Sequence, residues 1–155
     1  MAESAALERK PWLTRAYAAE DREALVNLWQ QCGLIRPWND PYRDIERKLK
    51  NRPEWLRVAE VQRSANRWRL IGSVMIGYDG HRGWVNYLAV HPRWQGQGLG
   101  TALMRYAEHV LTAEACPKLS LLVRSDNDTV RAFYARLGYQ LDEAIPMGKR
   151  LLKDD

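Results

Sequence analysis

The spacing of apolar residues changes along the chain between the period of a strand and that of a helix. Apolar residues favour a strand at residues 13–17, and helical spacing follows over residues 21–33, which end in a glycine. A second helix is predicted over residues 40–50, because Asp40 is a residue type that caps helices and Pro41 is favoured at the first helical position. The chain therefore begins with one strand and two helices.

A run of strands is predicted next. Residues 56–61 and 68–78 are rich in strand-forming residues and are joined by a polar stretch, which is typical of an antiparallel hairpin. Asp79 and Gly80 mark a turn, and a third strand is predicted over residues 84–90, directly before a glycine-rich loop. The middle of the chain is thus expected to build antiparallel sheet.

The second half of the chain alternates helices and strands. Apolar residues within 99–111 repeat at positions i, i+3, i+4 and i+7, the spacing of an amphipathic helix. Residues 119–123 form a short apolar strand pattern, and residues 130–137 form a closing helix that Gly138 terminates. A final pair of strands is expected over residues 139–152.

The order of these elements predicts the fold. A strand that crosses through a helix to another strand implies a right-handed unit with parallel pairing. We therefore predict an α/β (α+β) fold with a mixed central sheet, antiparallel N-terminal strands, a parallel central βαβ pair and helices on both faces. The length of 155 residues is that of one domain, which we expect to span residues 12–155 after a loosely ordered lead-in at residues 1–11.

Composition narrows the class of protein. No apolar run approaches the roughly 20 residues that a membrane span requires, and the first residues lack the pattern of a secretory signal, so we expect a cytoplasmic protein without a membrane partner. Cys32 and Cys116 stand far apart and without a pattern of metal ligands, so neither a disulfide framework nor a metal site is expected. The net charge of +5 suits a polyanionic partner or a phosphate-rich cofactor.

Seven tryptophans, several of them beside arginines, raise the alternative of a stacking surface for nucleic acid. Trp29 lies on the apolar face of a predicted helix, and Trp68 and Trp84 lie in or beside predicted strands. No RNA- or DNA-binding motif accompanies them. Nucleic acid is therefore not the expected partner, and a basic nucleic-acid-binding module stays as an alternative.

The glycine-rich loop of residues 95–101 reads QGQGLGT and lies between a predicted strand and a predicted helix. Its glycines leave backbone N–H groups open at the positive end of the helix dipole, which suits a phosphate group. A Walker loop would need a lysine after its last glycine, and a Rossmann fingerprint would need a glycine where Thr101 stands. The loop is thus an anion site of another class.

The loop and its surroundings resemble the GNAT superfamily of N-acetyltransferases, whose loop reads Gln or Arg, two residues, Gly, one residue, and Gly or Ala. Gln95, Gly98 and Gly100 match this pattern. The resemblance covers nearly the whole chain and implies acetyl-CoA as the co-substrate, with no metal. Four further segments are similar to one bacterial subfamily of these enzymes, namely residues 36–41, 44–48, 78–83 and 148–151.

The resemblance also implies which residues bind acetyl-CoA. In this superfamily the strand before the loop pairs with the pantetheine arm, the loop amides hold the pyrophosphate, and an asparagine contacts the arm. Tyr134 falls where many members place a tyrosine near the sulfur, and it is the expected catalytic acid. The implied cofactor-binding residues are Leu88, Ala89, Val90, Gln95, Gly96, Gln97, Gly98, Leu99, Gly100, Thr101 and Asn127.

The acceptor side is less defined. Trp38 and Asn39 lie in the loop between the first two helices, where this superfamily shapes its acceptor pocket. Asp40, Asp79 and His81 are candidates for a general base, although each also fits an ordinary role as a helix cap, a turn or a surface group. The glutamate that several members carry in the strand before the last helix is missing here, because that strand is apolar.

We therefore expect the chain to transfer an acetyl group from acetyl-CoA to a primary amine of a small molecule or a peptide, by direct attack in a ternary complex. A catalytically silent acyl-CoA sensor that keeps the loop is the second alternative. The resemblance also implies that the chain can form a homodimer.

Overall fold

The computed structural model describes residues 10–154, so residues 1–9 of the expected lead-in and Asp155 lie outside the described residues. The order of elements follows the sequence prediction as far as the last helix. The elements are β1 (Trp12–Ala16), η1 (Ala19–Asp21), α1 (Arg22–Gln31), α2 (Pro41–Leu49), η2 (Pro53–Trp55), β2 (Leu56–Ser64), β3 (Arg67–Tyr78), β4 (Gly83–Val90), η3 (Pro92–Trp94), α3 (Leu99–Ala113), β5 (Leu119–Ser120) and α4 (Asp128–Arg136).

The strands form one five-stranded sheet in the order β1-β2-β3-β4-β5. Neighbouring strands are antiparallel from β1 to β4, whereas β4 and β5 are parallel. The helix α3 makes the crossover between these two parallel strands. The mixed sheet with one parallel βαβ pair is therefore confirmed.

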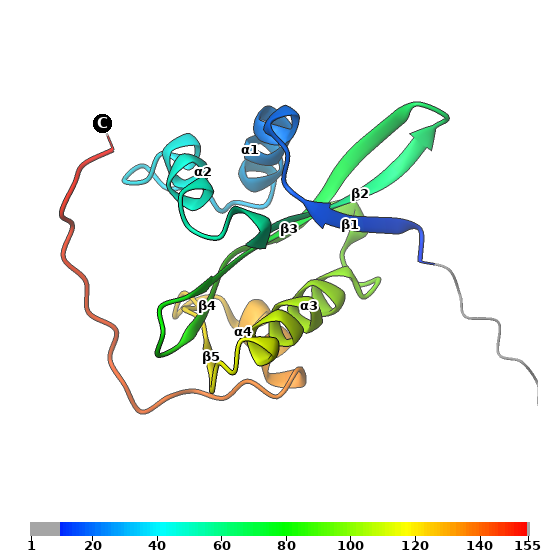
Figure 1. The fold of residues 1–155 in the computed structure, drawn as a ribbon. Coiled ribbons are helices and arrows are strands. Elements are labelled where there is room, and N and C mark those ends of the chain that lie inside the picture. The colour runs from blue at the N-terminus through cyan, green and yellow to red at the C-terminus, as the bar shows by residue number, and fades with distance from the viewer. Residues whose placement is uncertain (1–9, 155) are drawn as a thin grey trace, which may run out of the picture.

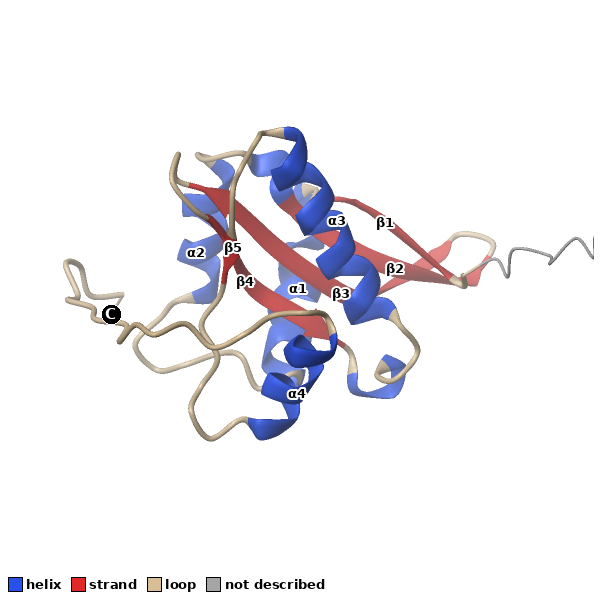
Figure 2. Cartoon of the chain, turned by 90° about the horizontal axis from the view of Figure 1, so that it is seen from below, coloured by secondary structure: helices blue, strands red, loops and turns tan. Residues whose placement is uncertain are grey.

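The helices cover both faces of the sheet, as predicted. α1 and α2 lie on one face, and α3 and α4 lie on the other (Figure 1, Figure 2). Each helix buries an apolar stripe against the sheet, so each face has its own core. The first core includes Leu25, Trp29, Ile45, Leu56 and Val58, and the second includes Ile71, Val74, Leu99, Leu103 and Tyr134.

Tryptophan is a packing residue of both cores. Trp12, Trp29 and Trp55 are at most 8% exposed. The indole N–H of Trp29 donates to Ser73 Oγ at 2.9 Å, so its polar atom is satisfied inside the core. These three side chains are thus part of the interior, whereas Trp38 and Trp68 are 51% and 44% exposed.

The predicted helix boundaries agree with the caps in the structure. The Asp40 carboxylate accepts hydrogen bonds from two backbone amides in the first turn of α2, and Pro41 is its first residue. Asn127 Oδ1 accepts from the Val130 amide at 3.2 Å and caps α4 in the same way. Beyond the end of α4, Gly138 has a φ of +94°, a conformation that glycine adopts without strain.

The strand expected over residues 119–123 is shorter than predicted. β5 comprises only Leu119–Ser120, and it pairs with β4 only at Gly83 and Trp84. Residues 121–123 line a cavity instead, so they have no neighbouring strand with which to form hydrogen bonds. Apolar composition alone did not reveal that the two strands part here.

The final pair of strands expected over residues 139–152 is wrong. Because β5 is two residues long, its outer edge offers too few backbone groups to pair with another strand. The segment instead runs past β5 and on toward α2 (Figure 1). Its large apolar side chains are 72–94% exposed, namely Leu141, Ile145, Met147, Leu151 and Leu152.

Candidate active site

A cavity of about 840 Å³ lies where β4 and β5 part. Its wall is built from the α1–α2 loop, α2, the end of β3, residues 84–88 of β4, residues 121–124 and α4. Because residues of α2 and of α4 line the same cavity, it connects the two faces of the sheet. Two molecules could therefore meet in it from opposite sides.

A bulge in β4 shapes the middle of this cavity. Tyr87 and Leu88 stand opposite a single residue of β3, and Tyr87 has a φ of +51°, which is rare outside glycine. The Tyr87 ring stacks on Trp29 with 3.7 Å between centroids, and its carbonyl accepts from Ser73 Oγ at 2.8 Å. Its hydroxyl donates to Asp44 Oδ2 at 2.6 Å. The unusual backbone is therefore held by contacts on every side.

The environment also fixes the protonation of Tyr87. Burial and the hydrogen bond to Asp44 raise the pKa of Tyr87 well above its usual range. The hydroxyl consequently remains protonated and keeps donating to the carboxylate at neutral pH. Tyr87 is thus a fixed part of the cavity wall.

Within the glycine-rich loop, Gly98 is the N-cap of α3 and has a φ of +89°. The first helical hydrogen bond runs from the Ala102 amide to the Gly98 carbonyl, at 3.0 Å, so the preceding amides have no acceptor within the helix. A β-carbon on Gly100 would approach Phe133 Cζ to 3.2 Å, so glycine allows α4 to pack close to the loop. Residues 95–98 are exposed, and the amides that follow them at the N-terminus of α3 have no acceptor within the helix.

Tyr134 on α4 combines a buried ring with a hydroxyl that has no protein partner. The ring packs edge-on against Phe133 and Tyr139, with centroid distances of 5.1 and 5.7 Å. The hydroxyl forms no hydrogen bond with any residue of the range 10–154, and burial raises the pKa of Tyr134 to about 12. Tyr134 and Asn127 both line the cavity, so α4 offers it a neutral hydroxyl donor and an amide.

The opposite wall comes from the α1–α2 loop and from α2. Trp38 is 51% exposed, and its ring lies 5.5 Å from the guanidinium carbon of Arg124. Asn39 Oδ1 accepts from Arg150 at 2.6 Å. Lys48 of α2 also lines this wall, and its ammonium donates to the Ile76 carbonyl. This side is more polar and more basic than the side of α4.

The structure brings only some of the sequence-predicted residues into the cavity. The cavity is lined by Leu88, Asn127, Tyr134, Trp38, Asn39 and Asp79. Ala89 and Val90 lie on the same strand and residues 95–101 follow it, but none of these residues lines the cavity. Asp40 and His81 are outside it as well.

Two of the candidate bases already accept hydrogen bonds from the protein. The Asp79 carboxylate accepts from the amides of His81 and Arg82 and from Trp84 Nε1, and these contacts lower the pKa of Asp79 to about 2. The Asp40 carboxylate caps α2. Both side chains therefore have structural roles in a turn and in a helix start.

Sequence reasoning missed three cavity residues, Asp44, Lys48 and Tyr87. Asp44 and Lys48 are four residues apart on α2, so they share one helix face, and this spacing was visible in the sequence. Tyr87 appeared to be an ordinary strand residue, because alternation does not reveal a bulge. The polar face of α2 was therefore the sequence signal from which Asp44 and Lys48 could have been predicted as cavity residues.

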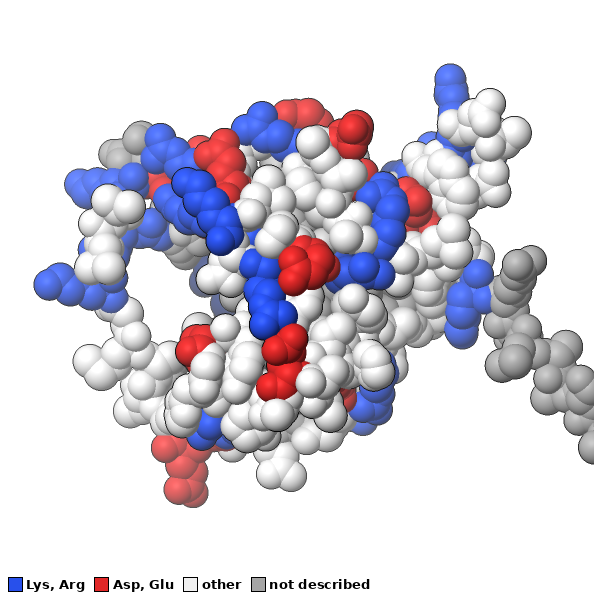
Figure 3. Space-filling model, in the orientation of Figure 1, with Lys and Arg blue, Asp and Glu red and all other residues white. Residues whose placement is uncertain are grey.

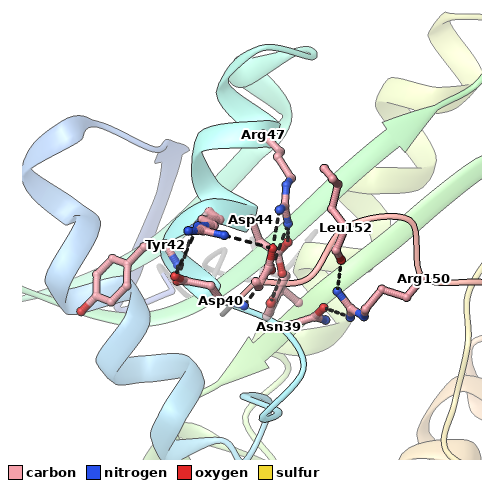
Figure 4. A network of polar contacts seen from close by, with 10 residues as sticks. Asn39, Asp40, Tyr42, Asp44, Arg47, Arg150 and Leu152 are labelled. Carbon is pink, nitrogen blue, oxygen red and sulfur yellow. Dashed lines mark hydrogen bonds and ion pairs between the residues drawn. The ribbon is translucent and has the colours of Figure 1, made fainter.

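The C-terminal segment is fastened beside this wall (Figure 4). The Asp154 carboxylate accepts from the Asp40 amide at 2.9 Å and pairs with Arg47 at 2.5 Å. Its side chain is 2% exposed, and the hydrogen bond from Arg47 holds the pKa of Asp154 below its usual range. The contact between Arg150 and Asn39 joins the same segment to the α1–α2 loop.

Two kinds of feature are absent from residues 10–154. No helix there has both the length and the apolar character needed to cross a membrane. No group of three or more His, Cys, Asp or Glu side chains lies close enough together in this range to hold a metal ion.

The sequence matches one family model and several named relatives. Residues 13–139 match the acetyltransferase (GNAT) family. An acetyltransferase of Pectobacterium atrosepticum is 48% identical over 140 residues, which are 90% of this chain and 96% of the relative. An acetyltransferase of Sodalis glossinidius is 46% identical over 141 residues, with the same two coverages.

Solved structures share the fold at lower identity. Ard1 from Thermoplasma volcanium has a TM-score of 0.73 and 22% identity, and the match covers 86% of this chain and 85% of that one. Glucosamine-6-phosphate N-acetyltransferase from Arabidopsis thaliana has a TM-score of 0.65 and 20% identity, with coverages of 92% and 99%. The NatC complex bound to Gag peptide and CoA has a TM-score of 0.69 and 18% identity, with coverages of 83% and 84%.

Proposed function

Because the chain belongs to the acetyltransferase (GNAT) family, we propose that it transfers an acetyl group from acetyl-CoA directly to an amine, without an acetyl-enzyme intermediate. The acceptor would be the primary amine of a small molecule or a peptide. One observation carries the proposal: a single cavity is lined by Leu88 and Tyr134 and also by the α1–α2 loop. Both reactants could then be bound at the same time, as direct transfer requires.

The donor fits along β4 in this proposal. The amides at the start of α3 would hold the pyrophosphate, because they have no acceptor within the helix and lie at the positive end of its dipole. From there the pantetheine arm would follow Leu88, Ala89 and Val90, whose edge toward β5 has no strand partner in the described part of the chain. Asn127 would contact the arm from α4.

The reaction would proceed through a tetrahedral intermediate. The amine nitrogen attacks the thioester carbonyl carbon, a C–N bond forms, and the C–S bond then breaks to release the thiolate of CoA. Tyr134 would donate a hydrogen bond to the leaving sulfur. With a pKa of about 12, the phenol is a weaker acid than a thiol near 8.5, so Tyr134 would keep its proton while it hydrogen-bonds to the sulfur, and the released thiolate would be protonated by the buffered solvent.

The amine must lose a proton, and Asp44 is our candidate for the group that receives it. Asp44 is a carboxylate that lines the cavity, and its two present partners are the Tyr87 hydroxyl at 2.6 Å and Arg47 at 3.1 Å. A carboxylate has about four acceptor positions, so it can also bind an ammonium group. Asp44 replaces Asp40 and Asp79 as the candidate base, because the carboxylates of those two residues accept hydrogen bonds from backbone amides.

Initial-rate kinetics tests the proposal. We expect release of free CoA thiol that depends on acetyl-CoA and on an amine from a panel of amino acids, short peptides, amino sugars and polyamines. Double-reciprocal plots should intersect, as they do for a ternary complex, and mass spectrometry of the protein with acetyl-CoA alone should find no acetylated form. Parallel plots together with an acetylated protein that passes its acetyl group to the amine would contradict direct transfer.

A further inference from the structure

The charges of the cavity restrict the kind of amine that it can bind. The two carboxylates that line the cavity, Asp44 and Asp79, already accept hydrogen bonds. Asp79 accepts from backbone amides of its own turn, and Asp44 accepts from Tyr87 and Arg47. Basic side chains also lie along the upper and left sides of the opening between the body and the C-terminal segment (Figure 3). The charged lining residues are Arg36, Arg47, Lys48 and Arg124 against Asp44 and Asp79.

Lys48 is the buried cation of this cavity. The residue is 8% exposed, and its ammonium donates to the Ile76 carbonyl. Lysine has three N–H donors, and within residues 10–154 no carboxylate lies within 4 Å of this ammonium. Burial accordingly lowers the pKa of Lys48. A buried ammonium with donors to spare is a site for an anionic group.

The strand register places Lys48 at the end of the cavity away from the phosphate loop. Its partner Ile76 lies opposite Val85, whereas the loop follows Val90 at the other end of β4. Leu88 and Tyr87 lie between these ends. An acceptor that reaches the middle of β4 from the side of α2 would therefore extend toward Lys48.

Asp44 and Lys48 together suit a molecule with two opposite charges. They are four residues apart on α2, so their β-carbons are about 5–6 Å apart on one face. Asp44 contacts Tyr87, beside the proposed reacting centre, and Lys48 lies toward Val85. The amine end of an acceptor fits Asp44, and an anionic end fits Lys48.

We propose that the acceptor is an amine that also carries a carboxylate or phosphate group, and that Lys48 binds this anionic group. The inference rests on the proposed acetyl transfer and adds its substrate class. Polyamines and other polycations are disfavoured by it, because their second charge would meet Lys48, and Glu54, the carboxylate whose charge acts on Lys48, does not line the cavity. Arg36 and Arg124 add to the positive lining of the cavity, and neither forms an ion pair in the described chain.

Matched pairs of amines test this assignment. Binding to the complex of the protein with CoA would be measured by calorimetry for short ω-amino acids, from glycine to 6-aminohexanoate, and for their amides. Phosphoethanolamine with ethanolamine forms the phosphate pair, and spermidine represents polycations. The variants are Lys48→Met, which keeps the length without the charge, Lys48→Arg, and Lys50→Met as a control that removes an exposed lysine at the end of the same helix.

We expect at least one anionic amine to bind at least about tenfold more tightly than its uncharged partner. Lys48→Met should abolish this preference, Lys48→Arg should retain part of it, and Lys50→Met should leave it unchanged. The Kd of acetyl-CoA should be the same in all four proteins. Thermal unfolding of each variant would establish that it is folded.

Three results would overturn the assignment. The first is equal or tighter binding of amides or spermidine, the second is a preference that survives Lys48→Met, and the third is no binding of any anionic amine although CoA binds. Failure of acetyl-CoA itself to bind would instead contradict the proposed acetyl transfer. The carboxylate and phosphate pairs distinguish the two kinds of anionic group.

Discussion

At the scale of single residues, Tyr134 and Gly98 carry different parts of the proposed chemistry. Tyr134 has a packed ring and a hydroxyl directed to no protein acceptor in residues 10–154, so its polar atom is available to a ligand. Gly98 contributes a backbone conformation and no side chain. One residue would therefore act on turnover and the other on donor binding.

Replacing Tyr134 by phenylalanine should lower kcat roughly 10- to 100-fold, because the leaving sulfur loses a hydrogen-bond donor. The Kd of acetyl-CoA should stay the same, since the ring and its packing remain. The pKa of about 12 means that the phenol is neutral at every pH below that value. The ratio of wild-type to variant kcat should thus be constant between about pH 7 and 10.

The measurement is a pair of pH–rate profiles with saturating acetyl-CoA. Tyr139→Phe serves as the matched control, because Tyr139 packs against the same ring and does not line the cavity. An unchanged kcat in Tyr134→Phe would refute the proposed contact with sulfur. A ratio that falls steeply between pH 8 and 10 would mean that the phenol titrates far below 12.

Gly98→Ala should weaken acetyl-CoA binding by about tenfold, since a left-handed backbone costs an L-residue about 1–2 kcal/mol. The loop would relax and move its amides away from the pyrophosphate. Gly80→Ala is the control: Gly80 has a similar φ of +87° and no atom within 4 Å of the added β-carbon, but it lies in the β3–β4 turn. Calorimetry should find weaker binding only for Gly98→Ala, and equal Kd values would remove the loop from the donor site.

At the scale of elements, α2 contributes both to the stability of the fold and to the cavity wall that we propose for the acceptor. Its N-terminus is capped by Asp40, and its cavity face carries Asp44 and Lys48. The sequence presented Asp40 as either a cap or a base. The structure assigns its carboxylate to the backbone amides of the first turn.

Asp40→Ala should therefore destabilise the protein by about 1 kcal/mol and lower the Tm by about 2–4 °C, because the first turn of α2 loses its acceptor. Asp40→Ser should keep both stability and activity, since serine also caps helices. Thermal unfolding and kcat/KM would be measured for both variants. If Asp40→Ser unfolded at the wild-type temperature but lost nearly all of its kcat/KM, the Asp40 carboxylate would have a chemical role in addition to capping.

The sequence predicted some kinds of element better than others. Helices with a polar cap and an apolar stripe, such as α2 and α3, were predicted closely, because the signals are local. Strand pairing at β5 and beyond was not, because it depends on whether a neighbouring strand is present. Residues 121–123 are apolar enough for a strand, but in the structure they line the cavity.

The same distinction applies to the site. The glycine-rich loop and Tyr134 were predicted as site residues from short motifs and a resemblance to a family, and these roles stay predictions. The Tyr87 bulge and the burial of Lys48 depend on contacts between distant parts of the chain, with Asp44 and with the Ile76 carbonyl. No motif encodes such contacts, so the cavity wall formed by α2 and Tyr87 became visible only in the fold.

At the scale of the molecule, the cavity connects the two faces of the sheet, and the C-terminal segment borders the side that we propose for the acceptor. Lys118 pairs with Asp142 at 2.7 Å where the segment passes β5, and Asp154 joins it to α2. The exposed apolar residues lie mostly between these two attachments. The segment is thus attached near β5, at the α1–α2 loop through Arg150 and Asn39, and at α2 through Asp154, and loss of the Asp154 contacts would leave the last part of the segment held by Arg150.

Asp154→Asn should release this attachment, because the amide cannot replace the charge that pairs with Arg47 and Arg43. We expect the Tm to fall by about 2–4 °C and the Asp40 amide, which now donates to Asp154, to exchange its hydrogen faster. Acceptor KM should change while the Kd of acetyl-CoA does not, since the segment contacts Asn39 and α2 rather than the loop at α3. Hydrogen-exchange mass spectrometry and initial rates would measure these effects.

Lowering the pH should destabilise the wild-type protein, as the Asp154→Asn substitution does. The folded pKa of Asp154 is lowered, so the stabilisation is complete above the ordinary aspartate pKa of about 4 and is lost as the pH falls below it. Asp142→Asn is the matched control, since it removes the attachment near β5 and leaves Asp154 in place. The hydrogen-exchange rate of the Asp40 amide would be compared in the two variants. If it were no faster in Asp154→Asn than in Asp142→Asn, other contacts would hold the segment to α2, and the proposed effect of Asp154 on acceptor KM would be contradicted.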